Sequence, residues 1–543
     1  MRKFFDFILK PFGAQLPFFL TLWILASMAD LLGWIKNGDY IFAAYLALHG
    51  YVICYLCTLI CGLFKENSTA LKVYKILLLV LGIINLIADT FCYNVCQNGF
   101  TNSTVALILD TNMEEATGML DMYMTHSVIC PVVIGVALVI LILLIRNLIV
   151  KMARFWLRCV MLIALLLVSV TTIVRKSGNY NGVFLCKVGL FLSYDRPKDL
   201  DVFRTEPELI IESHQPAAVV LIIGEALAKN HCSLYGYEKQ TQPLLEAMRD
   251  SSSLLVYNNV QSAVQWTVPS FITLMTEARA DDVNGSEWRN MTFLMDLMKS
   301  AGYKSYWLTN QPLKGLVDNA VSKFAFLADS VYCSRGENKV DYYDDFVLPV
   351  IAGIKDSLEK QFFVIHQMGS HEHFKDRSPQ EFRRFTASDY QEYATHSFSL
   401  SKRETISGQV TGLDEKLQTL ADYDNSILFN DYVVTSIMHS FDDTEAVVFY
   451  FPDHGMDIFV TDETYAGHSR ENVPESMALG KEIPFVVYMT QKYLELNADK
   501  VSLFKQNVNT DFCTEDMIYT LTDVAGATIA GNDNVNDYSL IRK

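Results

Sequence analysis

Hydrophobic residues are unevenly distributed along this chain, and their excess lies almost entirely before residue 175. In that part, five apolar runs follow one another, each close to the roughly 20 residues that an α-helix needs to cross a bilayer. The first run lacks a small-residue cleavage site and is followed at once by the second, unlike a cleaved signal peptide. The pattern predicts five transmembrane helices, over residues 14–35, 40–64, 73–93, 127–145 and 155–174.

Basic residues indicate how these helices are oriented. Lys and Arg precede the first run and lie between the second and third and between the fourth and fifth, whereas residues 94–126 contain neither. Because loops rich in Lys and Arg stay in the cytoplasm, we expect a cytoplasmic N-terminus. Five crossings then place everything after about residue 176 outside the cytoplasm.

A different pattern begins at residue 217. Short apolar runs rich in β-branched residues, typical of buried parallel strands, alternate with helical segments. This alternation predicts an α/β domain with a mainly parallel sheet. We therefore expect a transmembrane domain over residues 1–175, a linker over 176–215 and an extracytoplasmic catalytic domain over 216–543. The predicted strands lie at 217–223, 305–308, 361–365, 446–451 and 483–488.

Chemically reactive side chains follow several of these strands. Glu225 comes after the first strand, His371 after the third, Asp453 and His454 after the fourth, and His468 a little further on. Because ligands bind beyond the carboxyl ends of parallel strands, we expect these side chains to meet at one edge of the sheet. Together they form a ligand set suited to Zn²⁺. Each residue by itself is more often a surface Glu or a core His, and only their shared position favours a site.

A candidate nucleophile stands in the segment 261–270. Pro269 suits the first turn of a helix, which places Thr267 just before a helix N-terminus. Free backbone N–H groups and the helix dipole favour a phosphoryl group there. From spacing alone, an ordinary N-cap threonine is an equally good interpretation.

The net charge of the chain is −17. An acidic chain is a poor partner for nucleic acid, whose phosphates bind surfaces rich in Lys and Arg. We therefore expect no nucleic-acid partner, and most of these carboxylates belong to an ordinary solvated surface.

Several motifs resemble those of the phosphoethanolamine transferases. Gly224-Glu225-Ala226 and the segment 233–243 resemble the opening motif of that family, a metal-binding Glu followed by a Gly-Tyr, Thr and Pro signature. The family also has five N-terminal membrane helices, so the resemblance covers most of the chain. The later matching pieces, in order, are Trp307-Leu308-Thr309-Asn310-Gln311, His366-Gln367-Met368-Gly369-Ser370-His371, Tyr423-Asp424-Asn425-Ser426-Ile427 with Asp431, Asp453-His454-Gly455, and His468.

The resemblance implies an N-terminal five-helix transmembrane bundle joined to a sulfatase-like α/β domain of the alkaline phosphatase superfamily. It also implies one or two Zn²⁺ ions and a set of site residues. The implied metal ligands are Glu225, Thr267, Asp453 and His454, and the implied catalytic or substrate-binding residues are His371, His468 and Asn310.

The loop before the fourth predicted helix adds two further candidates. Thr111 and Glu115 resemble a Thr/Glu pair implicated in binding the lipid donor. A third polar member of that set is expected four residues before Thr111, where this chain has Leu107.

The nucleophile segment departs from the lipid A-modifying members, which carry Cys-Gly-Thr-x-Thr-Ala-x-Ser-Val-Pro-Cys with the second Thr as nucleophile. Aligned on the Val-Pro pair, that position is Val264 here, and both cysteines are missing. Thr267-Val268-Pro269-Ser270 instead resembles the sulfatase pattern Cys-x-Pro-Ser, with Thr in the place of the nucleophile. We therefore predict Thr267 as the nucleophile, with Ser262 and Ser270 as alternatives.

The resemblance implies a multi-pass enzyme of the bacterial inner membrane with a periplasmic catalytic domain. Its reaction would move phosphoethanolamine from phosphatidylethanolamine to lipid A, another glycolipid or a surface glycan. Two alternatives stay open. A glycerophosphate transferase resembling lipoteichoic acid synthase shares the helices and the Thr nucleophile, but the Gly-Tyr-x-x-x-Thr-x-Pro signature speaks against it. A catalytically inactive membrane scaffold is disfavoured by the near-complete ligand set.

Overall fold

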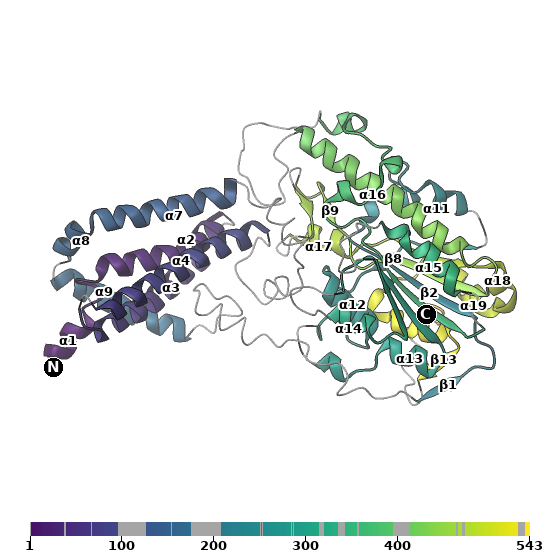
Figure 1. Ribbon diagram of the computed structural model, residues 1–543, viewed down its shortest axis with the longest axis horizontal. Coiled ribbons are helices and arrows are strands. Elements are labelled where there is room, and N and C mark those ends of the chain that lie inside the picture. Colours follow the sequence, from purple (N-terminus) through teal and green to yellow (C-terminus); the bar gives the residue numbers. More distant parts are fainter. Residues whose placement is uncertain are drawn as a thin grey trace. The chain divides into compact units, whose positions relative to one another are not determined.

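A computed structural model describes residues 2–36, 40–66, 68–95, 126–153, 155–174, 208–249, 251, 253–283, 285, 287–313, 320–334, 343–355, 358–394, 413–462, 465–469, 473–529 and 538–542. These residues form two compact units, one built from the N-terminal helices and one that contains every described strand (Figure 1). Residues 175–207 lie outside the described residues, so the predicted linker and domain boundaries stay a proposal.

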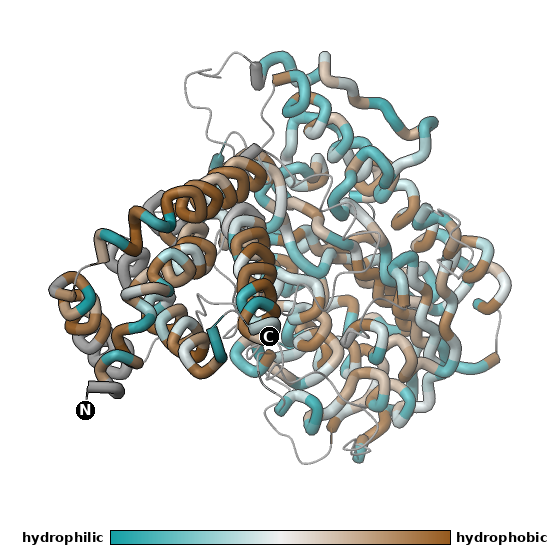
Figure 2. The backbone as a smooth tube through the Cα atoms, turned by 60° about the vertical axis from the view of Figure 1, so that its left-hand side comes forward, coloured by the Kyte–Doolittle hydropathy of each residue, from teal (hydrophilic) through white to brown (hydrophobic). Residues whose placement is uncertain are grey.

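The N-terminal unit consists of helices with apolar outer faces. Five of them, α2, α3, α4, α7 and α9, lie over the five predicted membrane segments, and Figure 2 shows these helices as mainly hydrophobic. Large apolar side chains such as Ile76 and Leu144 are exposed, which suits a lipid surrounding better than water. The helices are α1 (Arg2–Ile8), α2 (Leu16–Lys36), α3 (Tyr40–Ile60), α4 (Thr69–Val95), α7 (His126–Leu144), α8 (Arg146–Met152) and α9 (Phe155–Val174).

Length and composition support fewer membrane spans than the sequence pattern predicts. Among the described residues, one helix, Thr69–Cys92 within α4, is long and apolar enough to cross a membrane. Helices α7 and α8 supply a second span if this pair, bent by 68°, is one span. The segments Leu16–Ala29 and Ala47–Leu63 are shorter apolar helices. Five crossings therefore stay a prediction.

The second unit is built around a central sheet whose described strands run in the order β3-β11-β8-β2-β7-β5-β6. Strands β8, β2, β7, β5 and β6 are parallel to one another, whereas β11 is antiparallel to both of its neighbours, β8 and β3. The sheet is therefore mixed, where the sequence predicted a mainly parallel one. A buried apolar run does not reveal the direction of its strand, so the sequence could not identify β11 as the antiparallel strand. The strands are β2 (Ala218–Gly224), β3 (Leu254–Tyr257), β5 (Lys304–Thr309), β6 (Ser330–Cys333), β7 (Gln361–His366), β8 (Ala446–Pro452) and β11 (Phe485–Met489).

Three short pairs lie outside the central sheet: β1 with β13, β9 with β10, and β4 with β12. The pairs β1 with β13 and β4 with β12 join distant parts of the chain, whereas β9 and β10 are close together in the sequence and follow β8. The six strands are β1 (Leu209–Ile211), β4 (Val260–Gln261), β9 (Asp457–Ile458), β10 (Ala466–Gly467), β12 (Phe512–Cys513) and β13 (Ala527–Ile529).

Helices cover both faces of the central sheet (Figure 1). Every second residue of β2, starting at Val219, packs on the side of α12, α13 and α20, and the others, starting at Ala218, pack on the side of α11, α15 and α16. Both sets are fully buried, which explains the uninterrupted apolar run of this strand. The helices are α11 (Pro243–Met248), α12 (Thr267–Met275), α13 (Leu294–Ser300), α14 (Ala320–Ala325), α15 (Val347–Ile354), α16 (Leu413–His439), α17 (Pro474–Lys481), α18 (Gln491–Leu496), α19 (Ala498–Gln506) and α20 (Met517–Val524).

Candidate active site

Two parallel neighbours in the sheet carry the first part of the site to the same place. Strands β2 and β8 pair so that Gly224 lies opposite Pro452, and the next residues are Glu225 and Asp453. The backbone N–H of Asp453 donates to the carbonyl of Gly224 at 3.1 Å, and that of Ala226 donates to Oδ1 of Asp453 at 3.1 Å. The register of the sheet therefore sets the two carboxylates side by side at its carboxyl edge.

Glu225, Asp453 and His454 form a buried group of potential metal ligands, with one atom from each lying within 4.8 Å of the others. Nδ1 of His454 lies 2.8 Å from the carbonyl oxygen of Gly455. Because a carbonyl only accepts, Nδ1 carries the proton, and Nε2 is left as the nitrogen that faces the carboxylates. Burial also lowers the pKa of His454, which favours the neutral imidazole that binds metals.

The spacing of these atoms fits zinc. Nε2 of His454 lies 3.5 Å from Oε1 of Glu225 and 3.5 Å from Oδ2 of Asp453. Ligands about 2.0–2.1 Å from a tetrahedral Zn²⁺ lie roughly 3.3 Å apart. Within the described part of the chain, neither Nε2 of His454 nor Oδ2 of Asp453 makes a hydrogen bond, although both atoms are buried. Since buried polar atoms are normally satisfied, the residues present fit a bound cation.

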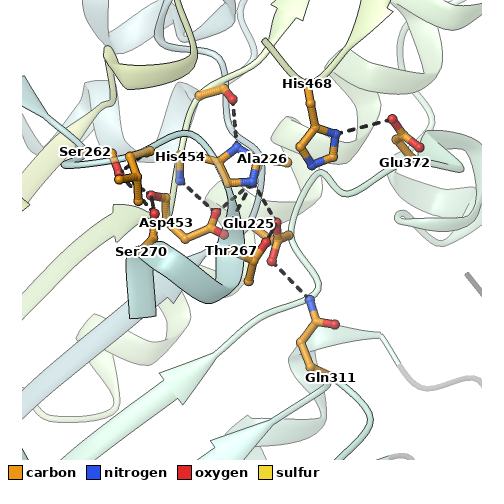
Figure 3. A network of polar contacts seen from close by, with 12 residues as sticks. Glu225, Ala226, Ser262, Thr267, Ser270, Gln311, Glu372, Asp453, His454 and His468 are labelled. Atoms are coloured by element: carbon orange, nitrogen blue, oxygen red, sulfur yellow. Dashed lines mark hydrogen bonds and ion pairs between the residues drawn. The ribbon is translucent and has the colours of Figure 1, made fainter. Parts of the chain in front are cut away.

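Thr267 lies against this group and is the first residue of α12 (Figure 3). Its Oγ1 donates to Oε1 of Glu225 at 3.2 Å. Trp266, in an extended conformation, occupies the N-cap position and makes no side-chain cap. Thr267 is therefore not a capping residue, and its hydroxyl stands at the ligand group and at the N-terminus of a helix, where an anion is favoured.

The two alternative nucleophiles, Ser262 and Ser270, contact the backbone of Asp453 and not the side chains of the ligand group. Oγ of Ser262 and Oγ of Ser270 lie 2.6 Å and 2.9 Å from the carbonyl oxygen of Asp453. Both serines are buried, and their two oxygens lie 3.3 Å apart. These hydroxyls support the backbone that carries Asp453, and they do not face the ligand group in the way that Thr267 does.

The two predicted histidines lie at the margin of the ligand group. The ring of His468 stacks on Trp266 at a centroid distance of 4.9 Å and an interplanar angle of 14°. It also lies 5.0 Å from the ring of His454 and 6.4 Å from that of His371. Nδ1 of His468 lies 3.6 Å from Oε1 of Glu372. The ring of His468 thus lies next to the ligand group and to Trp266, and the ring of His371 lies near that of His468.

Two neighbours of Glu225 received no role from the sequence. Nε2 of Gln311 donates to Oε2 of Glu225 at 3.4 Å, and Nε2 of His366 lies 3.8 Å from the same oxygen. Burial lowers the pKa of His366 to about 4, so its ring is neutral. Both residues follow or end predicted strands, which is the signal that could have singled them out.

The side chain of Asn310 points elsewhere. Its Nδ2 donates to Oδ1 of Asp344 at 2.9 Å, and its Oδ1 accepts from Ser334. Asp344 in turn accepts the backbone N–H groups of Met368 and Gly369, both at 2.8 Å. Asn310 therefore helps to hold the loop that leads to His371, and a direct contact with substrate stays a prediction. Thr111 and Glu115 lie outside the described residues.

Comparison with known proteins places the second unit in a family. Residues 217–527, more than half of the 543 residues, match the protein family described as Sulfatase. The chain belongs to the sulfatase family. Its catalytic unit thus has the sulfatase-like α/β fold of the alkaline phosphatase superfamily that the resemblance implies, with the mixed sheet described above.

Among the relatives of this sulfatase-family chain are proteins named for phosphoethanolamine transfer, which confirms the resemblance. The chain is 28% identical over 327 residues to phosphoethanolamine transferase EptC of Escherichia coli O18:K1:H7, covering 59% of this chain and 52% of the relative. It is 26% identical over 324 residues to phosphoethanolamine transferase CptA of Salmonella typhimurium, covering 59% and 52%. The chain therefore spans about half the length of the curated relatives it matches.

Solved structures agree on the fold. The integral membrane protein lipooligosaccharide phosphoethanolamine transferase A from Neisseria meningitidis matches with a TM-score of 0.65 at 16% identity, over 97% of this chain and 98% of that one. The periplasmic domain of EptC from Escherichia coli, in a complex with Zn, matches with a TM-score of 0.51 at 24% identity, over 63% and 90%. The first match extends the likeness in fold to the N-terminal helices of this sulfatase-family chain.

Proposed function

We propose that this chain is a metal-dependent enzyme of the bacterial inner membrane that transfers phosphoethanolamine from phosphatidylethanolamine to lipid A, another glycolipid or a surface glycan. The observation that carries the proposal is the hydrogen bond from Thr267 to Glu225 within a buried Glu-Asp-His ligand group. The names of the relatives, phosphoethanolamine transferases, support the choice of the transferred group.

In the first step, Oγ1 of Thr267 attacks the phosphorus of the donor. Its proton leaves toward Oε1 of Glu225, which already accepts its hydrogen bond. The bond between phosphorus and the diacylglycerol oxygen breaks, and that oxygen takes a proton from His468, the imidazole beside Trp266. Phosphoethanolamine is then held as an ester of Thr267, which divides one difficult transfer into two easier steps.

In the second step, the acceptor hydroxyl attacks the same phosphorus and gives its proton to His468. The bond between phosphorus and Thr267 breaks, and the threonine oxygen recovers its proton from Glu225. Both groups return to their starting protonation states, so protons balance over the cycle. Imidazole suits such exchange because its ordinary pKa lies near 6.5. His371 would steady the phosphoryl group.

The residues that would hold a Zn²⁺ ion are Glu225, Asp453 and His454, with Thr267 as the fourth ligand. A bound zinc lowers the pKa of a coordinated hydroxyl and polarises phosphoryl oxygens. In a form with two ions, His371 and His468 would hold the second ion in place of the roles given above, which leaves the number of ions at one or two.

The N-terminal helices would place the catalytic unit beside its lipid donor. We propose a multi-pass arrangement with a cytoplasmic N-terminus and a periplasmic catalytic domain, supported by the distribution of Lys and Arg and by the whole-length match to an integral membrane protein. Thr111 and Glu115 would contact the donor headgroup.

Donor choice tests this proposal against its alternatives. Purified full-length chain with zinc should release diacylglycerol from phosphatidylethanolamine but not from phosphatidylglycerol. Release from phosphatidylglycerol alone would establish the glycerophosphate alternative. Release from neither lipid, by a protein that binds zinc, would favour the scaffold.

A further inference from the structure

The ring of His468 is held on more than one side. Trp266 covers one face of the ring, and the ring of His454 lies 5.0 Å away at an angle of 43°. Glu372 approaches the edge of the ring, with Oε1 3.6 Å from Nδ1 (Figure 3). Glu372 is itself buried, with 5% of its surface exposed.

Hydrogen bonds hold in place the two segments that contact His468. The carbonyl oxygen of Glu372 accepts from Nη2 of Arg377 at 2.6 Å, which fixes the loop after β7. On the other side, Ser469 donates to Oε1 of Gln265 at 2.9 Å. Consecutive residues of one segment, 265 and 266, therefore contact consecutive residues of the other, 469 and 468. The stack on Trp266 thus belongs to a wider contact and is not isolated.

This arrangement has a chemical consequence for the imidazole. A carboxylate only accepts hydrogen bonds, so a carboxylate at Nδ1 keeps the proton on that nitrogen. Nε2 is then the nitrogen that exchanges a proton with the reacting group. A carboxylate at the far nitrogen of a catalytic histidine sets its tautomer and orientation in this way in the Ser-His-Asp triads of hydrolases.

We propose that Glu372 is a positioning residue for His468: it accepts the Nδ1 proton while Trp266 fixes the plane of the ring. The distance of 3.6 Å would shorten to a hydrogen bond when substrate is present, as catalytic hydrogen bonds commonly do. The proposal rests on the proposed function, because His468 acts as the proton carrier only in that reaction. The motif that names His371 assigns nothing to the residue after it.

The test compares two substitutions of Glu372 in the full-length, zinc-loaded chain, with diacylglycerol release from phosphatidylethanolamine as the readout. Glu372→Ala removes the acceptor and should lower kcat by roughly 10- to 100-fold, with KM unchanged. Glu372→Gln keeps the size of the side chain, but its amide can donate to Nδ1 and favour the wrong tautomer, so its kcat should fall at least as far as that of Glu372→Ala. Glu381→Ala, an exposed glutamate of the same segment, is the matched control and should have the rate of the original chain.

Melting temperature and zinc content should be the same in all four proteins. A Glu372→Ala protein with the original kcat would overturn the proposal. So would a Glu372→Gln protein with the original kcat, because the size of the side chain and not its carboxylate would then hold the ring of His468. If the original chain releases no diacylglycerol, the proposed function itself fails, and the role of Glu372 fails with it.

Discussion

The hydroxyl of Thr267 lies 3.2 Å from Oε1 of Glu225, a contact that joins the first residue of α12 to the residue that follows β2. This contact brings together the features that a phosphoryl-transfer nucleophile needs. The oxygen has an acceptor for its proton, a metal-ligand group beside it and a helix N-terminus beneath the incoming anion. Ser262 and Ser270 are close in sequence but point at the carbonyl of Asp453.

Substitutions should show whether Thr267, and not one of the two serines, is the nucleophile. Thr267→Ala removes the nucleophile and should lower transfer by at least about 10³-fold, while the melting temperature changes little because the side chain is only half-buried. Ser270→Ala should keep the covalent intermediate but weaken zinc binding, since it loosens the support of Asp453. Steady-state transfer assays on both variants check this; a Thr267→Ala protein with normal turnover would contradict it.

Zinc should stabilise the folded chain. A ligand that binds only the folded state adds about 2.7 kcal/mol when present at 100 times its Kd, and the unsatisfied atoms of Asp453 and His454 are the groups it would satisfy. Chelation should therefore lower the melting temperature and abolish transfer, and added zinc should restore both. In Asp453→Asn, zinc should no longer change the melting temperature. If the original chain melts at the same temperature with and without zinc, the metal site is wrong.

Asp344 should matter for the loop that carries His371. Asp344→Ala removes the acceptor of the N–H groups of Met368 and Gly369 and of one donor from Asn310. Leaving such buried donors without this acceptor should cost about 3 kcal/mol of unfolding free energy. Asp345→Ala, at the half-buried neighbouring residue, should cost under about 1 kcal/mol. Equal denaturation midpoints for the two variants would contradict this role.

Asp431 should make stability depend on pH. Burial raises its pKa to about 7 from 3.8, although it accepts the N–H groups of Leu244 and Leu245. The folded chain therefore holds this proton more tightly than the unfolded chain, so stability falls as pH rises from about 4 to about 7. At roughly 1.4 kcal/mol per pKa unit, the full change is on the order of 4 kcal/mol.

The matched variant for this titration is Asp431→Asn, which cannot ionise. It loses one acceptor and should be less stable than the original chain at pH 5. The difference in melting temperature between the original chain and Asp431→Asn should narrow as pH rises from 5 to 8. Only the original chain loses stability in this pH range, because only it has an Asp431 that ionises. A difference that is constant from pH 5 to pH 8 would show that Asp431 is ionised throughout.

Much of the catalytic unit could be predicted from the sequence because strand ends carry strong signals. A fully buried strand reads as a continuous apolar run, and the first polar residue after it marks the edge of the sheet. That reasoning picked out Glu225, Asp453 and His454, which the structure brings together. The direction of β11, which makes the sheet mixed, left no such signal in the sequence.

Other features of the site could not be predicted from the sequence, because they depend on the direction of individual side chains or on contacts between distant residues. Asn310 and Gln311 are adjacent after β5, so their side chains point in different directions, and the pattern does not say which one meets Glu225. The structure places Gln311 there. The stack of Trp266 on His468 joins residues about 200 positions apart, and neither hydrophobic periodicity nor a local motif records such a contact.

Mass spectrometry of the intact chain after incubation with phosphatidylethanolamine, followed by peptide mapping, locates the covalent intermediate. We expect a phosphoethanolamine adduct on Thr267, absent from Thr267→Ala and absent after chelation of zinc. An adduct on Ser262 or Ser270 would contradict the assignment of the nucleophile. Diacylglycerol release by a protein that never carries an adduct would contradict the covalent mechanism.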